Sequence, residues 1–247
     1  MIQILEERAM NAWPALQVML YDGWVLRFAD GYTRRANSVS PLYASSQDIE
    51  EKIRRCEHFY RRRGLSAIFK MTVESFPASL DNLLAQKGYT VEAPTSVQTL
   101  DLGNIEIISQ PAHLEVELTE AWLANQCWLN ASSSSVAEEQ QLIQQQILQN
   151  IVPATCFASV DEGSEVVACG MGVLEGELLG IFDVATAKEH RRRGHGRQLM
   201  LNLLWWGKRN GARTAYLQVM LDNPPALSLY EKLGFREVYQ YWYRVKR

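Results

Sequence analysis

Residues 191–196 read Arg-Arg-Arg-Gly-His-Gly, and this stretch decides more about the fold than any other part of the chain. A strand-like apolar run, 178–186, precedes it, and a helix-like run, 198–208, follows it. Glycines at a strand-to-helix junction leave main-chain N–H groups bare, and the helix adds unpaired N–H groups and the positive end of its dipole. The junction, with arginines at 191, 192, 193 and 197, therefore predicts a polyphosphate site.

The loop by itself is not diagnostic. It lacks the Gly-x4-Gly-Lys-Ser/Thr pattern of a P-loop. It also lacks the third glycine or alanine of a dinucleotide-binding fingerprint, because Leu199 stands three residues after Gly196. A basic turn between a strand and a helix is the alternative interpretation.

The residues after the loop favour a polyphosphate site over a plain basic turn. The helix 198–208 ends at Asn210-Gly211, and a short apolar run, 215–220, reads as a strand. Asn223-Pro224-Pro225 can start a further helix, which Gly234 ends. The aromatic-rich run 239–245 reads as a final strand.

Three linked motifs now stand in order: Arg191-x-x-Gly194-x-Gly196, Asn223-x-x-Ala226-x-x-x-Tyr230, and Leu233-Gly234-Phe235. In order and spacing they resemble the GCN5-related N-acetyltransferases. The resemblance covers residues 155–247 and extends over 105–155. It implies a mixed α/β fold (an α+β mixed sheet) of the acyl-CoA N-acyltransferase type, with helices flanking mainly antiparallel sheets.

Elements expected in the second half agree with that fold. The runs 105–109 and 114–117 are candidate opening elements, and 115–129 reads as a helix. Ser132 to Ser135 can cap a Gln-rich helix, 136–149. Strands are expected at 155–160 and 165–174, joined by a turn at 161–164.

A weak internal repeat relates the two halves of the chain. Residues 53–89 resemble 199–235, with Gly64 in the place of Gly211 and Gly88 in the place of Gly234. The repeat predicts two similarly folded domains, 1–104 and 105–247. A plain α/β domain that shares only the helix-strand-helix order is the alternative for the first.

The first copy lacks the features that carry chemistry in the second. An expected strand, 34–41, leads into residues 42–48, which contain no glycine. Asp48 in that segment would repel a phosphate, and Leu84 stands where the second copy has Tyr230. The first domain is therefore expected to be a degenerate copy without a pyrophosphate loop.

The resemblance also implies roles for individual residues. Main-chain N–H groups of 193–196 would cradle the pyrophosphate of coenzyme A, and Tyr230 would protonate the leaving thiolate, unless it only packs as a helix aromatic. Asn223 would bind the pantetheine arm or cap its own helix. The set expected to bind the cofactor is Val184, Ala185, Thr186, Arg192, Arg193, Gly194, His195, Gly196, Arg197 and Asn223, with the His195 side chain facing solvent.

Other parts of the site stay open at this point. Glu117, Glu120 and Asp183 are candidate general bases, and a water chain is the alternative. Four aromatic residues could line an acceptor pocket or belong to the core: Trp122, Trp128, Tyr241 and Trp242.

Composition narrows the class of partner. The chain has 247 residues, 47% of them apolar, and a net charge of −3, which favours neither nucleic acid nor an acidic membrane surface. Its four cysteines and four histidines show no metal-ligand spacing, so no metal is expected. No signal peptide and no apolar run of about 18 residues is recognised, so a cytoplasmic protein is expected.

The resemblance implies an enzyme that moves an acetyl group from acetyl-CoA to a primary amine of a small molecule, an amino acid or a peptide. The protein would be a monomer or a homodimer. A non-catalytic acyl-CoA-binding sensor or subunit and a protein-lysine acetyltransferase are the alternatives.

Overall fold

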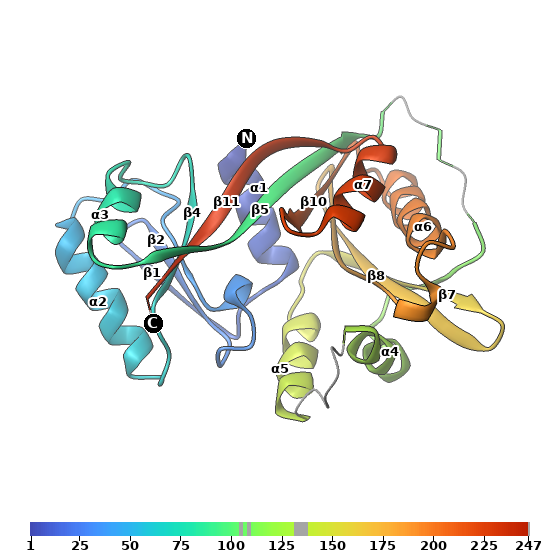
Figure 1. Cartoon of the computed structure of the whole chain (residues 1–247), viewed down its shortest axis with the longest axis horizontal. Helices are drawn as coiled ribbons and strands as arrows, with labels where there is room; N and C mark the ends of the chain where they lie inside the picture. The colour runs from blue at the N-terminus through green and yellow to red at the C-terminus, as the bar shows by residue number, and fades with distance from the viewer. Residues whose placement is uncertain (104–105, 108–109, 131–137, 247) are drawn as a thin grey trace. The chain divides into compact units, whose positions relative to one another are not determined.

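A computed structural model describes residues 1–103, 106–107, 110–130 and 138–246. The chain forms two compact units (Figure 1). Unit 1 comprises Met1–Val97, Met220–Asp222 and Val238–Arg247, and unit 2 comprises Gln98–Val219 and Asn223–Glu237. The final strand of the sequence therefore gives most of its residues to the first unit. In the described part of the chain, no helix has the length and apolar character that crossing a bilayer requires.

Unit 1 is an α/β unit. Its strands follow the order β1-β2-β3-β4-β11, with β3 and β4 parallel and the other neighbours in this order antiparallel. Trp24, Phe69, Tyr60 and Leu84 are among the side chains of its core. Its elements are α1 (Ile2–Ala12), β1 (Gln17–Tyr21), β2 (Trp24–Phe28), β3 (Val39–Ser40), α2 (Ile49–Arg61), β4 (Ile68–Thr72), α3 (Leu80–Gln86) and β5 (Thr90–Asp101), whose last residues lie in unit 2.

The strand expected at 34–41 is wrong over its first half. Arg34–Ala36 is a 3-10 turn, because the Thr33 side chain accepts a hydrogen bond from the Ala36 N–H. The Asn37 side chain accepts from the N–H groups of Ala29 and Gly31, at 2.8 and 3.0 Å, and holds the turn closed. Local side-chain bonds of this kind compete with strand pairing, so that only Val39–Ser40 remains extended in the sheet.

Unit 2 has strands in the order β6-β7-β8-β9-β10. Neighbours are antiparallel except β9 and β10, which are parallel. Figure 1 shows α4 and α5 on one side of β7 and β8, and α6 on the other. The elements are β6 (His113–Glu115), α4 (Glu120–Asn130), α5 (Glu138–Gln149), β7 (Ala154–Glu162), β8 (Glu165–Glu175), β9 (Leu178–Thr186), a 3-10 turn (Lys188–His190), α6 (His195–Arg209), β10 (Thr214–Met220) and α7 (Pro224–Lys232). Strand β11 (Arg236–Val245) begins in unit 2 and continues in unit 1.

Two boundaries in unit 2 differ from expectation. The helix expected from residue 115 begins at Glu120, since His113–Glu115 pairs with β7 as a strand. Helix α6 begins at His195, three residues earlier than its apolar pattern indicates. The proposed Ser132–Ser135 cap, and residues 105, 108 and 109 of the expected opening element, lie outside the described residues.

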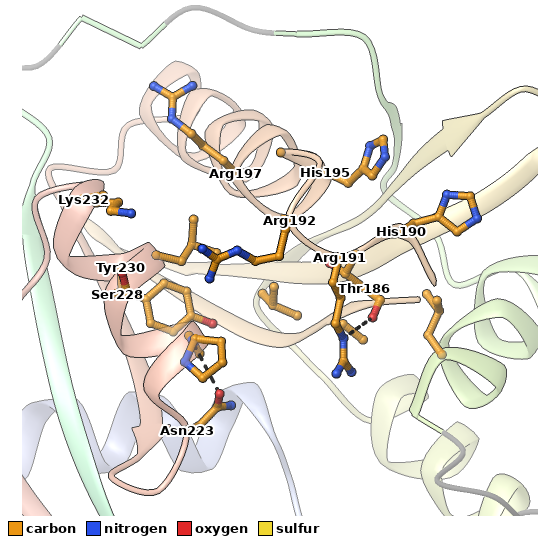
Figure 2. Close-up of a pocket in the computed structure, with 18 of the residues that line it drawn as sticks. Thr186, His190, Arg191, Arg192, His195, Arg197, Asn223, Ser228, Tyr230 and Lys232 are labelled. Atoms are coloured by element: carbon orange, nitrogen blue, oxygen red, sulfur yellow. Dashed lines mark hydrogen bonds between the residues drawn. The ribbon is translucent and has the colours of Figure 1, made fainter. Parts of the chain in front are cut away.

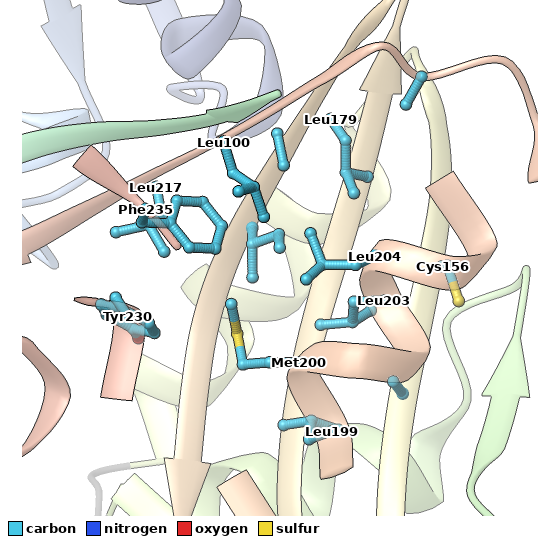
Figure 3. Close-up of a cluster of buried hydrophobic side chains, with 14 of the residues drawn as sticks. Leu100, Cys156, Leu179, Leu199, Met200, Leu203, Leu204, Leu217, Tyr230 and Phe235 are labelled. Atoms are coloured by element: carbon cyan, nitrogen blue, oxygen red, sulfur yellow. The ribbon is translucent and has the colours of Figure 1, made fainter. Parts of the chain in front are cut away.

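The core of unit 2 explains why α6 has its sequence. Leu199, Met200, Leu203 and Leu204 recur at helical spacing and are all buried against the strands (Figure 3). A Cβ at Gly207 would lie 2.5 Å from the Leu179 side chain, so that the close approach of α6 to β9 requires glycine there.

The order of elements is the same in both halves. The series α2-β4-α3-β5 is matched by α6-β10-α7-β11, and Ile68 and Thr214, which begin β4 and β10, are 146 residues apart. The four glycines that align in the sequence all have φ between +70° and +99°, a conformation that favours glycine at helix ends: Gly64, Gly88, Gly211 and Gly234.

Candidate functional site

Strands β9 and β10 part in the middle of their length. Their parallel ladder joins Leu178–Ile181 to Thr214–Leu217 and ends there. From Phe182 to Thr186, β9 pairs with β8 alone. This leaves one edge of β9 with main-chain groups available to an extended ligand.

A bulge in β9 lies at the point of divergence. Met171 pairs with Phe182 but Cys169 pairs with Ala185, so β9 has an additional residue between them. Asp183 has φ of +52°, which is uncommon for a residue other than glycine. The Gln126 side chain on α4 donates a 2.6 Å hydrogen bond to the Asp183 carbonyl. The bulge is thus held by a fully buried amide.

The glycine loop lies at the start of α6. Gly194 is the N-cap residue with φ of +95°, and no side chain caps the helix. The first main-chain bond of the helix runs from the Gln198 N–H to the Gly194 carbonyl at 2.9 Å. The N–H groups before Gln198 therefore have no partner within the helix and can bind an anion.

These features surround one pocket of about 930 Å³ in unit 2 (Figure 2). Arg191, Arg192, Arg197 and Lys232 give its wall positive charge. None of the described residues that line it is a carboxylate. This wall is therefore suited to a polyanion.

The structure brings together nine of the ten residues expected to bind the cofactor. All except Arg193 line the pocket, as does Tyr230. Arg193 instead contacts the carboxylate of Glu162 at 3.1 Å.

The expectation of a solvent-facing His195 is wrong. Its side chain is only 13% exposed, and its Nε2 lies 3.1 Å from Glu162 Oε2. The hydrogen bond with His190, which is the largest effect, helps to hold the pKa of the Glu162 carboxyl below its usual range.

Tyr230 is a buried residue that reaches the pocket. It is 8% exposed and packs edge-on against Phe235, with ring centroids 6.0 Å apart. Figure 2 shows its hydroxyl directed from α7 toward the side of the pocket where Arg191 and Thr186 lie. Burial raises the pKa of Tyr230 to about 12, so that the phenol keeps its proton at neutral pH.

Asn223 caps helix α7, which was the alternative to a role in ligand binding. Its Oδ1 accepts a hydrogen bond from the Ala226 N–H at 3.3 Å, and Pro224 follows as the first residue of α7. The side chain also lines the pocket, so that one residue both begins α7 and presents an amide to the cavity.

The candidate bases do not line this pocket. Glu117 and Glu120 are exposed, and Asp183 is half-buried beside it. The candidate acceptor aromatics are also elsewhere. Trp122 is buried and donates to the Ala158 carbonyl at 3.0 Å, while Trp128 is 60% exposed. Tyr241 and Trp242 belong to unit 1.

Two contributors, Gln126 and Glu162, were not identified from the sequence. Arg191 was expected only as one of the loop arginines, and it also donates from Nε to the Thr186 carbonyl at 3.2 Å and so joins the loop to the end of β9. Gln126 and Glu162 act through contacts with residues 57 and 33 positions away, respectively. No local pattern indicates such partners; Ser228 and Lys232 on α7, by contrast, are close enough to Tyr230 in the sequence to have been suspected.

Known structures share this arrangement. The GCN5-related N-acetyltransferase from Kribbella flavida superposes with a TM-score of 0.70 at 14% identity, covering 99% of this chain and 95% of that one. A tandem protein of the same class from the clavulanic acid biosynthesis pathway gives a TM-score of 0.58 at 16% identity, over 76% of this chain and 67% of its own. These likenesses establish the fold.

Sequence similarity establishes the family. The Uncharacterized N-acetyltransferase YobR of Bacillus subtilis (strain 168) is 30% identical over 253 aligned positions, covering 100% of this chain and 99% of that protein. The fold and this relative define a GCN5-related N-acetyltransferase. Within that class, the chain belongs to the family described as "Probable histone acetyltransferase Rv0428c C-terminal", whose model matches residues 1–244.

Proposed function

We propose that unit 2 transfers an acetyl group from acetyl-CoA to a primary amine of a small molecule, an amino acid or a peptide. The observation that carries this proposal is the open edge of β9 beyond Ile181, which runs toward the glycine loop at the start of α6. An extended arm that ends in phosphates needs both features in this order. Acetyl-CoA supplies an activated acyl group as a thioester.

The phosphate end of the pocket fits the pyrophosphate of that cofactor. The unpaired N–H groups at Gly196 and Arg197 would donate to it, and Arg192 lies on the same wall. A Cβ at Gly196 would lie 3.4 Å from Thr186 Oγ1, which is an ordinary contact. Glycine at 196 is thus needed for the approach of a ligand rather than for the packing of the protein.

The reacting end of the pocket would lie between β9 and α7. Main-chain groups of Val184, Ala185 and Thr186 would pair with the pantetheine arm, and an N–H of this strand would donate to the thioester carbonyl oxygen. Tyr230 would give its hydroxyl proton, or a hydrogen bond, to the departing sulfur. A protonated phenol inside a buried wall can do this across the neutral pH range.

In this proposal, water accepts the proton that the amine loses. Glu117, Glu120 and Asp183 do not line the pocket, whose described wall contains no carboxylate. The acceptor would enter as the neutral amine or pass its proton through ordered water to the surface. Among the described residues, the wall thus offers no fixed negative charge that would select a strongly cationic acceptor.

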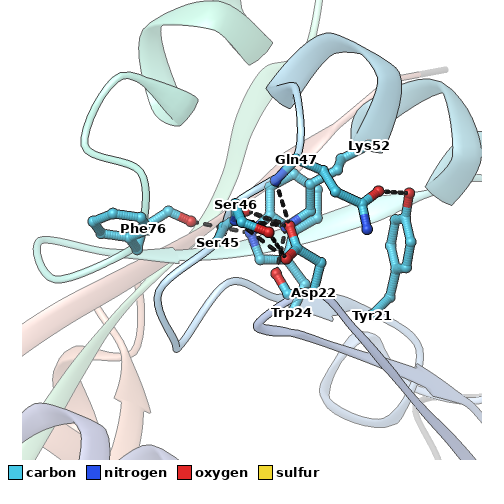
Figure 4. Close-up of polar contacts among 8 residues, drawn as sticks. All are labelled: Tyr21, Asp22, Trp24, Ser45, Ser46, Gln47, Lys52 and Phe76. Carbon is cyan, nitrogen blue, oxygen red and sulfur yellow. Dashed lines mark hydrogen bonds and ion pairs between the residues drawn. The ribbon is translucent and has the colours of Figure 1, made fainter.

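Unit 1 is proposed to be a degenerate copy that binds no coenzyme A. Where unit 2 has its glycine loop, unit 1 has the loop before α2, and the Asp22 carboxylate occupies it (Figure 4). Asp22 accepts from the N–H groups of Ser46, at 3.1 Å, and Gln47, at 3.0 Å. The buried Lys52 ammonium pairs with the same carboxylate at 3.0 Å. The N–H groups that could have bound a phosphate therefore already hold an anion of the chain itself.

A protein lysine is the second candidate acceptor. The description of the family as a histone acetyltransferase favours it. The side chain of a lysine within a disordered tail can enter the same pocket as a small amine, and both acceptors react through a primary amine. The two acceptors would therefore be distinguished by the surface around the pocket, which would contact the rest of a protein substrate.

Release of free thiol from acetyl-CoA, measured with a panel of small amines, amino acids, N-terminal peptides and lysine peptides, tests the proposal. We expect saturable binding of acetyl-CoA by calorimetry and acceptor-dependent thiol release for one class. Binding without release for any acceptor would contradict the transfer reaction. Failure of acetyl-CoA to bind would contradict the site.

A further inference from the structure

Two histidines and a glutamate that are far apart in the sequence meet at one edge of the phosphate pocket. Glu162 is the last residue of β7, His190 ends the 3-10 turn before the loop, and His195 is the first residue of α6. Glu162 Oε2 lies 2.6 Å from His190 Nδ1 and 3.1 Å from His195 Nε2. One potential ligand atom from each residue lies within 4.8 Å of the other two.

We propose that Glu162, His190 and His195 form a binding site for a zinc ion. Two imidazole nitrogens and one carboxylate oxygen are a ligand set that zinc accepts in tetrahedral geometry, with water at the fourth position. Ligand atoms of such a site are about 3.3 Å apart, as bond lengths of about 2.0–2.1 Å require. Small rotations of the Glu162 side chain would separate its oxygen from the two nitrogens by that amount.

The present contacts show what the ion would replace. A single carboxylate oxygen faces a ring nitrogen from each histidine, so that protons on the imidazoles now bridge the three groups. A zinc ion takes the place of those protons and needs both nitrogens as free acceptors. The side chains of His190 and His195 are 22% and 13% exposed, and so they are positioned by packing rather than by solvent.

Arg193 is the positive group that faces this cluster. Its Nη1 lies 3.1 Å from Glu162 Oε1 and 3.3 Å from Oε2. The side chain is 55% exposed and can turn toward solvent, and an exposed ion pair of this kind is weak. Contact with Oε1 can also persist while Oε2 binds the ion, in which case Arg193 orients the carboxylate.

A zinc ion at this position would hold the loop before α6 in place. Both histidines line the pocket, but Figure 2 shows their rings directed away from the side where Tyr230 lies. An ion there would join the loop before α6 to the end of β7 without entering the space beside Tyr230. Zinc is thus proposed to fix the loop and to take no part in the chemistry.

Metal binding to the full chain tests this proposal independently of any acetyl transfer. The protein is freed of metal with a chelator, and zinc is titrated in competition with a chromophoric chelator. We expect one zinc per chain at micromolar or tighter affinity, and no competition from an excess of magnesium, which prefers oxygen ligands. Glu162→Gln and His190→Ala should each weaken binding at least tenfold, and circular dichroism should show that both variants remain folded.

A neighbouring pair provides the matched control. His113 Nε2 lies 2.7 Å from Asp161 Oδ2, with no third ligand near them among the described residues. His113→Ala should leave zinc binding unchanged. Cobalt(II) substitution separates this site from the cysteines, because thiolate ligation adds an intense charge-transfer band that nitrogen and oxygen ligands lack. Absence of stoichiometric binding, affinity that both substitutions leave unaltered, or a thiolate band would overturn the proposal.

Discussion

The side-chain amide of Gln126 donates a 2.6 Å hydrogen bond to the main-chain carbonyl of Asp183. Gln126 lies on α4 and is fully buried, and Asp183 lies at the bulge where β9 leaves the register of β8. The open edge of β9 beyond this bulge is the proposed binding site of the pantetheine arm. A buried side chain from a helix thus holds the backbone geometry on which the proposed site depends.

Replacement of Gln126 by leucine should reduce turnover more than stability. The Asp183 carbonyl would lose this hydrogen bond, and such a loss costs about 1–3 kcal/mol in the free energy of unfolding. The loss should fall near the lower end, because Gln126 Oε1 is itself buried without a partner and leucine removes it. A small displacement of β9 should lower kcat by about 10- to 100-fold. Urea denaturation and steady-state kinetics measure the two effects.

The matched control for this substitution is Gln144→Leu. Gln144 is another buried glutamine, on α5, and its Oε1 accepts from the Cys127 thiol at 3.3 Å. The Gln144→Leu variant should be less stable than the wild type, but its folded form should keep the wild-type kcat. Equal losses of kcat in the two variants would contradict a specific role for Gln126.

Tyr230→Phe should lower kcat by about 100-fold and leave the Kd of acetyl-CoA nearly unchanged, because only the proton donor to the sulfur is removed. The pKa of about 12 predicts that the wild-type enzyme shows no loss of activity from ionisation of this phenol below about pH 10. Tyr89→Phe removes a hydroxyl that bonds Glu57 in unit 1, at 2.8 Å, and serves as control. Unaltered turnover in Tyr230→Phe would remove this residue from the mechanism.

Gly196→Glu should weaken acetyl-CoA binding by at least about 100-fold, because it places a carboxylate beside the pyrophosphate. Gly196→Ala separates charge from bulk. Its Cβ would lie 3.4 Å from Thr186 Oγ1 and 3.5 Å from Leu229 Cδ2, so that the fold should accept it. Calorimetric titration of both variants with acetyl-CoA provides the measurement, and retention of wild-type affinity by the glutamate variant would refute the loop assignment.

Asp22→Asn should destabilise the protein more at neutral pH than in acid. Hydrogen bonds, first from the Gln47 N–H and then from Lys52, hold the pKa of Asp22 well below its usual range. A carboxyl with a lowered folded-state pKa contributes stability that is fully present above its unfolded pKa of about 3.9 and declines progressively as the pH falls from there through the folded-state pKa. Urea denaturation at pH 7 and pH 3 should therefore show a difference from wild type at pH 7 that shrinks at pH 3.

An exposed aspartate is the control for that comparison. Asp222→Asn removes the same charge at a position open to solvent. It should alter stability little at either pH. A difference between Asp22→Asn and wild type that stays constant from pH 7 to pH 3 would show that the carboxylate does not hold the loop.

Sequence periodicity predicts most elements of the fold because the forces that set them are local. A few neighbouring residues are enough to predict the apolar face of α6, its end at Gly211 and the start of α7 at Asn223-Pro224. The strand expected at 34–41 failed for the converse reason. Its alternation resembles a strand, but main-chain hydrogen bonds to the side chains of Thr33 and Asn37 form a turn that apolar periodicity does not reveal.

The sequence by itself determined the family, the glycine loop and the positions of Asn223 and Tyr230, because glycine conformations and helix ends are written in short motifs. Only the tertiary structure decided that Gln126 holds the bulge of β9, that Asp22 occupies the loop of unit 1 and that Glu162 joins His190 and His195. It also decided that His195 is sheltered and that Arg193 lies away from the pocket wall. These relationships join residues on different elements, and the distances between them depend on how helices and strands pack rather than on spacing along the chain.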